Sequence, residues 1–169
     1  MPREVYDNHQ YLDRSDVLTY DEITRLVGIA VGLGVTKVRL TGGEPLLRRE
    51  IGTLVSMLAK TEGVNDLAMT TNALQLSKMA ADLVSAGLNR VTISLDAIDD
   101  AVFKRMIDTD VDVSVVLRAI EDAWEAGLGP IKVNTVLRKG WNEDQILLLA
   151  EYFRGTPHVL RFIEYMDVG

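Results

Sequence analysis

A double glycine followed by an acid and a proline is the stretch of this chain best suited to holding a ligand. Residues 41–45 read Thr-Gly-Gly-Glu-Pro and follow a short run with strand character. Gly42 and Gly43 lack a Cβ atom, so their backbone accepts unusual angles and a ligand can approach closely. Pro45 suits the first turn of a helix, and a strand-to-helix turn is a natural place for a charged ligand. Taken alone, the segment is also explained by a tight turn that needs small residues.

Polar residues also recur at alternate positions of four predicted strands. Because successive side chains of a strand point to opposite faces, one face of the sheet is aliphatic. The other face carries Lys37, Arg39, Thr41, Thr70, Asn72, Thr92, Ser94, Asp96, Lys132 and Asn134. Burying a cation such as Arg39 or Lys132 without a partner is costly. An anionic ligand would offset that charge, and phosphate is the common choice.

Two arrangements of the sheet explain this polar face. An open sheet would expose the face to solvent. A curved sheet or partial barrel would instead enclose a polar lumen that a ligand fills. We favour the second arrangement because the polar groups crowd at the carboxyl ends of the strands, where the active sites of βα-barrels lie.

The elements that position these residues repeat along the chain as helix, glycine and strand. Strands are predicted at residues 37–41, 67–71, 90–95, 131–136 and 159–163. Helical stretches alternate with them, and four of these stretches stop at a glycine followed by an aliphatic residue: Gly34, Gly63, Gly87 and Gly127. The alternation predicts an α/β fold with parallel strands and right-handed crossovers, organised as a single domain over residues 1–169.

Local signals set the ends of three helices. Thr19 and Glu22 have the spacing of a capping box at the start of the first helix. Leu47 and the following aliphatic residues are assigned to the second helix. Asn142 and Gln145 resemble a cap for the last one, which runs through residue 153.

The composition excludes several classes of function. The 169-residue chain has a formal net charge of −7, which argues against broad nucleic-acid binding. It contains no cysteine, so it forms no disulfide and no thiolate metal site by itself. We find no apolar run of membrane-spanning length, and we expect no secretory leader. A cytoplasmic protein is therefore expected.

The segments at residues 39–49, 70–72, 94–96, 132–136 and 161–167 together resemble a known family. In order and spacing they are similar to GTP 3′,8-cyclase of molybdenum cofactor biosynthesis (molybdenum cofactor biosynthesis protein A), a radical SAM enzyme. The resemblance covers residues 1–169 and implies a partial (βα) barrel with helices outside the sheet. A Gly-Gly-Glu-Pro motif alone indicates only the superfamily, whereas the full set of segments is far more specific.

The resemblance also implies roles for individual residues. The positions that match contacts to S-adenosylmethionine are Gly42, Gly43, Ser94 and Met166. The positions that match contacts to GTP are Arg39, Thr70 and Lys132. Glu44 is expected near the amino group of S-adenosylmethionine. Four of these residues also belong to the polar face derived from strand alternation.

The family's reaction follows by implication. A 4Fe-4S cluster reduces S-adenosylmethionine, the resulting 5′-deoxyadenosyl radical takes a hydrogen from the ribose of GTP, and the ribose carbon bonds to C8 of guanine. The product is (8S)-3′,8-cyclo-7,8-dihydroguanosine 5′-triphosphate, and the pathway partner is cyclic pyranopterin monophosphate synthase. The cofactor supplies the radical chemistry while the protein positions and shields it, so no acid–base pair is assigned.

The chain departs from the family in its cysteines. The family holds two 4Fe-4S clusters with cysteines near both ends, and this chain has none. We therefore expect a central fragment that lacks the first strand and is inactive alone. Its unpaired sheet edge is expected to pair with another copy, giving a homodimer. The rival hypotheses are a non-catalytic nucleotide-binding module without a cluster, and a different radical SAM enzyme acting on a peptide.

Overall fold

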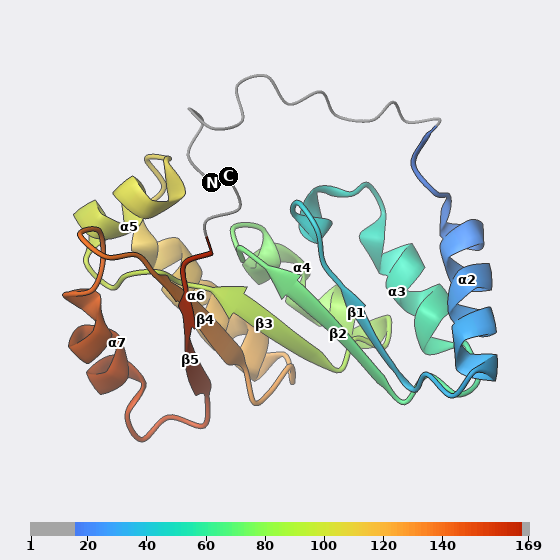
Figure 1. The fold of residues 1–169 in the computed structure, drawn as a ribbon. Coiled ribbons are helices and arrows are strands. Elements are labelled where there is room, and N and C mark those ends of the chain that lie inside the picture. Colours follow the sequence, from blue (N-terminus) through green and yellow to red (C-terminus); the bar gives the residue numbers. More distant parts are fainter. Residues whose placement is uncertain (1–15, 167–169) are drawn as a thin grey trace.

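A parallel sheet forms the centre of the protein in the computed structural model, which describes residues 16–166. The five strands lie in sequence order, and each pairs with the next one (Figure 1). They are β1 (Lys37–Leu40), β2 (Asp66–Thr71), β3 (Arg90–Ser94), β4 (Lys132–Leu137) and β5 (Val159–Glu164). The predicted α/β class and parallel order are confirmed.

Helices connect the strands. They are α2 (Tyr20–Gly32), α3 (Ile51–Ala59), α4 (Leu76–Ser85), α5 (Asp100–Ile107), α6 (Val113–Glu125) and α7 (Gln145–Phe153), with a 3₁₀ turn, η2 (Pro45–Leu47), after β1. Figure 1 shows α2 and α3 at the β1 end of the sheet, and α5 and α7 at the β5 end. None of the helices in the described part of the chain is both long and apolar enough to cross a membrane.

The predicted helix boundaries are largely confirmed. The four stop glycines all have positive φ angles, from 94° at Gly34 to 105° at Gly87, which only glycine adopts without strain. The capping box at the start of α2 is complete, because the Thr19 side chain accepts from the Glu22 backbone N–H while the Glu22 carboxylate accepts from the Thr19 backbone N–H.

Two local predictions are wrong. Leu47 does not belong to the second helix: it ends the 3₁₀ turn and is 74% exposed, and a left-handed Glu50 separates it from α3. Asn142 does not cap α7 either, because Asp144 occupies the cap position. The Asn142 side chain is instead fully buried, and it forms hydrogen bonds with backbone groups that are described below.

The core lies between the sheet and its helices. The aliphatic side chains of the central strands are buried, for example Met69, Ile93 and Val133, each at 0% exposure. The opposite face is not simply solvated, since Thr92 is 2% exposed there and Ala68 3%. The Arg39 side chain reaches across this face to the Thr92 hydroxyl. This finding agrees with the curved, partial-barrel arrangement.

Candidate functional site

The loop after β1 has the geometry of a backbone cradle. Gly42 and Gly43 have φ angles of 97° and 43°, and a Cβ atom built on either one would meet nothing within 4 Å. Both are exposed. Their conformation therefore comes from the turn itself, and the space beside them is open to a ligand that contacts backbone groups.

The side chain of Glu44 joins this loop to the end of β2. Its Oε1 accepts hydrogen bonds from the Leu46 backbone N–H at 3.0 Å and the Thr71 hydroxyl at 2.7 Å. Its Oε2 accepts one from the Asn72 backbone N–H at 2.7 Å. A carboxylate bonded in this way holds the loop after β1 against the end of β2. The structure thus gives Glu44 a role in loop attachment, and its expected place near the amino group of S-adenosylmethionine stays a prediction.

Arg39 lies across the polar face of the sheet. Its Nη1 donates hydrogen bonds to the hydroxyls of Thr70 and Thr92, both at 3.0 Å. Thr70 was predicted to share a site with Arg39, and the structure brings the two into direct contact. Thr92 was placed on the polar face by strand alternation but was not assigned to the site. The strand register would have indicated it, because Thr70 pairs with Thr92 across β2 and β3.

Lys132 continues the same row of residues. It is the register partner of Thr92 across β3 and β4, so the row runs Thr70, Thr92, Lys132. One step further along β4, Asn134 Oδ1 accepts hydrogen bonds from Arg161 Nε and Nη2 at 2.9 and 2.7 Å. The face thus gathers the cations Arg39, Lys132 and Arg161, an arrangement suited to an anion with several charges.

Ser94 and Met166 lie at the carboxyl ends of other strands. Ser94 ends β3 and is exposed, while Met166 follows β5 and is 71% exposed. The Tyr165 backbone N–H donates to the Leu137 carbonyl at 3.1 Å, which extends the pairing of β5 towards Met166. Arg138 also fixes this segment, because its guanidinium lies over the rings of Trp141 and Tyr165, 4.0 and 5.0 Å from their centroids.

Buried polar groups support the strand ends beneath the site. Asn142 Nδ2 donates to the carbonyls of Asp96 and Val136, and its Oδ1 accepts from the Arg138 backbone N–H, at 2.8 to 2.9 Å. Asp96 Oδ1 accepts from the Val136 N–H at 2.8 Å. Burial raises the pKa of the Asp96 carboxyl above its ordinary value, and the Val136 hydrogen bond only partly opposes this effect.

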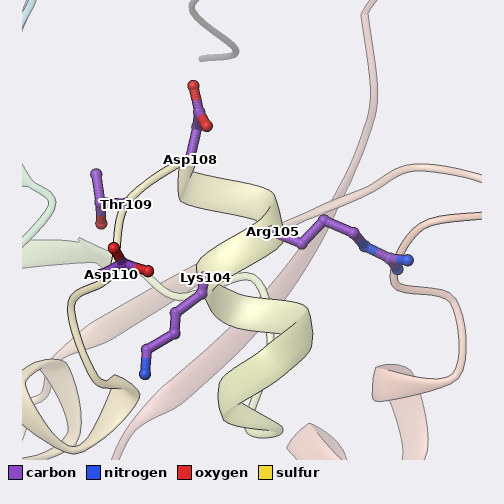
Figure 2. A pocket seen from close by; sticks show the side chains of 5 residues that line it. All are labelled: Lys104, Arg105, Asp108, Thr109 and Asp110. Carbon is purple, nitrogen blue, oxygen red and sulfur yellow. The ribbon is translucent and has the colours of Figure 1, made fainter.

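A separate hollow lies at the carboxyl end of α5 and carries no part of this site. It is lined by Lys104, Arg105, Asp108, Thr109 and Asp110 (Figure 2). Lys104 Nζ is paired with Asp100 Oδ2 at 2.6 Å, one turn earlier in α5. Arg105 extends away from the acidic loop and donates to the Trp141 carbonyl. Both cations of the hollow are therefore already engaged, Lys104 by Asp100 and Arg105 by the Trp141 carbonyl.

Comparison with known proteins assigns this fold and motif set to a superfamily. Residues 5–153 match the Radical SAM superfamily. The chain belongs to the radical SAM superfamily. Enzymes of this superfamily use S-adenosylmethionine and 4Fe-4S clusters. Among solved structures, the radical SAM fold is similar to Streptococcus suis SuiB bound to S-adenosylmethionine, with a TM-score of 0.74, 20% identity, and coverage of 95% of this chain and 36% of that one.

Curated relatives match the radical SAM chain along its whole length. It is 49% identical to a GTP 3′,8-cyclase of Acidothermus cellulolyticus, with coverage of 100% of this chain and 47% of the relative. The GTP 3′,8-cyclase of Xanthomonas axonopodis pv. citri is 48% identical, with 100% and 51% coverage. One from Staphylococcus aureus strain Mu3 is 43% identical, with 100% and 50% coverage. The chain therefore spans about half the length of the curated relatives it matches.

The two cofactors of the superfamily fit these residues differently. The open glycine cradle and the exposed Ser94 and Met166 have the chemistry to receive S-adenosylmethionine through backbone, hydroxyl and thioether contacts. A 4Fe-4S cluster requires thiolate ligands, and the sequence contains no cysteine. The described residues also contain no cluster of three or more His, Asp or Glu side chains able to hold a metal ion. The residues of this radical SAM chain do not fit the cluster.

Proposed function

We propose that the chain provides the S-adenosylmethionine- and GTP-binding core of a GTP 3′,8-cyclase. The single observation that carries the proposal is the contact of Arg39 with Thr70, in a row that continues to Lys132. These are the residues expected to bind GTP, and two cations beside hydroxyl groups suit a triphosphate. Curated cyclases that match the whole chain support the same assignment.

The two ligands would occupy adjoining parts of one mouth. Gly42, Gly43, Ser94 and Met166 are proposed to contact S-adenosylmethionine at the carboxyl ends of β1, β3 and β5. The polar face below them would hold the triphosphate and ribose of GTP. Glu44 connects the two parts, because it holds the glycine loop to Thr71, the residue after Thr70.

Equilibrium binding of nucleotides tests this proposal. Isothermal titration calorimetry should detect GTP binding to the purified chain and weaker binding of GMP, which has fewer phosphate charges. Lys132→Met should weaken GTP binding about tenfold. Lys60→Met is the matched control, because Lys60 is exposed at the end of α3, away from the polar face. Equal affinity for GTP and GMP, or an equal loss in both variants, would contradict the proposal.

A second candidate function is a nucleotide-binding module without a cluster, and the lack of cysteine favours it. The cyclase-core proposal and the module both predict that this chain alone is inactive, so a turnover assay tests this shared expectation. The chain is incubated with iron, sulfide, reductant, S-adenosylmethionine and GTP, and 5′-deoxyadenosine is measured. GTP-dependent turnover would contradict both the inactivity of the chain and the module.

The remaining proposals concern the setting of the protein. We propose a single domain in residues 1–169, a cytoplasmic location and transfer of the product to cyclic pyranopterin monophosphate synthase. We also propose a homodimer, because β1 pairs only with β2 within the described sheet and leaves an open edge. Sedimentation velocity tests the dimer, and a single monomeric species at high concentration would contradict it.

A further inference from the structure

We propose that Thr92 is a positioning residue for GTP binding. Its hydroxyl holds the Arg39 guanidinium beside the row formed by Thr70, Thr92 and Lys132, in an orientation that suits a triphosphate. This inference rests on the proposed binding of GTP. None of the motifs that indicate the family assigns a role to Thr92. The evidence is its burial, its register and its hydrogen bond.

The burial of Thr92 indicates that its hydroxyl serves Arg39. The residue is 2% exposed, and a hydroxyl in such a place requires a partner. Within the described residues that partner is Arg39 Nη1 at 3.0 Å. The two residues are 53 positions apart, so the contact depends on the sheet and not on local sequence.

The strand register places this hydrogen bond within the proposed GTP site. Thr92 lies between Thr70 and Lys132 in one row across β2, β3 and β4. Arg39 comes from β1, two strands away, and reaches over Thr70 to Thr92. The two hydroxyls use both hydrogens of Nη1. In the described part of the chain, the Nη2 and Nε groups have no partner, so they can donate to an anion beside Lys132.

Without the second hydroxyl, Arg39 would keep only Thr70 as an anchor. Its long side chain would then sample more rotamers, and ordering it again on binding would reduce affinity. Thr92→Val removes the hydroxyl while nearly preserving the volume. Thr92→Ser keeps the hydroxyl and should restore the interaction. The pair of variants separates positioning from packing.

Titration calorimetry with GTP provides the first test. We expect Thr92→Val to weaken GTP binding about tenfold and Thr92→Ser to stay within about twofold of the wild type. Thr135→Val is the matched control: Thr135 is a fully buried strand threonine on the helix side, with its hydroxyl bonded to the Leu95 carbonyl. It should lower stability without a comparable loss of GTP affinity.

A double-mutant cycle shows whether Thr92 acts through Arg39. In an Arg39→Met background, Thr92→Val should cause no further loss of GTP affinity. An equal loss in both backgrounds would overturn the inference. Wild-type affinity in Thr92→Val would overturn it too, while leaving the proposed function intact. No GTP binding by the wild-type chain would instead overturn the proposed function.

The position of Arg39 can also be followed without ligand. The Nε–Hε NMR signal of Arg39 should be shifted or broadened by Thr92→Val and little changed by Thr92→Ser, in chains that circular dichroism shows to be folded. An unchanged signal in Thr92→Val would show that Thr92 does not hold Arg39, whatever the result with GTP.

Discussion

The hydroxyl of Thr71 donates a hydrogen bond to Glu44 Oε1 at 2.7 Å and accepts one from the Ala73 backbone N–H at 2.9 Å. Through this hydroxyl, the glycine loop after β1 is attached to the turn after β2. That turn contains Ala73 with a φ angle of 65°, a strained conformation for a residue with a Cβ atom. The acid in the Gly-Gly-Glu-Pro segment therefore stabilises the mouth of the site.

Glu44→Gln should destabilise the protein and loosen the glycine loop. The amide oxygen can replace only one carboxylate oxygen, and the amide nitrogen would then face the Asn72 N–H, a donor against a donor. We expect the free energy of unfolding to fall by about 1–3 kcal/mol in urea denaturation. Glu62→Gln, at an exposed position, is the control. Equal stability of both variants would contradict the role of Glu44.

Asp96→Asn should remove a pH-dependent penalty. The pKa of Asp96 is raised in the folded protein, so its ionisation opposes folding, and stability is lost as pH rises above the unfolded pKa through the folded one. The Asn oxygen can still accept from the Val136 N–H. The stability of the wild type relative to Asp96→Asn should fall as pH rises from about 4 towards 7. Parallel pH profiles would contradict this prediction.

Asp66→Asn should have the opposite pH signature. The hydrogen bond from Arg90 lowers the pKa of Asp66, so the pair stabilises the fold above the unfolded pKa and its contribution is lost as pH falls through the folded pKa. The side chains are 19% and 32% exposed, which limits the effect to about 0.5–1 kcal/mol at neutral pH. Urea denaturation of both proteins should converge at low pH.

Asn142→Ala should be among the most destabilising polar substitutions. It removes a fully buried side chain and leaves the carbonyls of Asp96 and Val136 and the N–H of Arg138 without this partner. We expect the free energy of unfolding to fall by about 3 kcal/mol or more in chemical denaturation. Asn65→Ala, at an exposed position, should change it little. A loss below about 1 kcal/mol would contradict the structural role of Asn142.

The sequence by itself determined the repeating architecture. Helix–glycine–strand punctuation, the capping box at Thr19 and the period of two in the strands depend on neighbouring residues, so they can be read locally. Strand alternation also placed Arg39, Thr70, Thr92 and Lys132 on one face. The resemblance to the cyclases, carried by short motifs in order, then indicated which of them belong to a site.

Only the tertiary structure decided which residues of that face touch. The strand stagger puts Thr92 between Thr70 and Lys132 and lets Arg39 reach it from 53 positions away. The same holds for Glu44, whose partner Thr71 is 27 positions distant. It also holds for Asn142, because a polar loop sequence gives no sign that this side chain is buried. The physical reason is that strand register is set by packing and hydrogen bonding between distant segments, which no local pattern encodes.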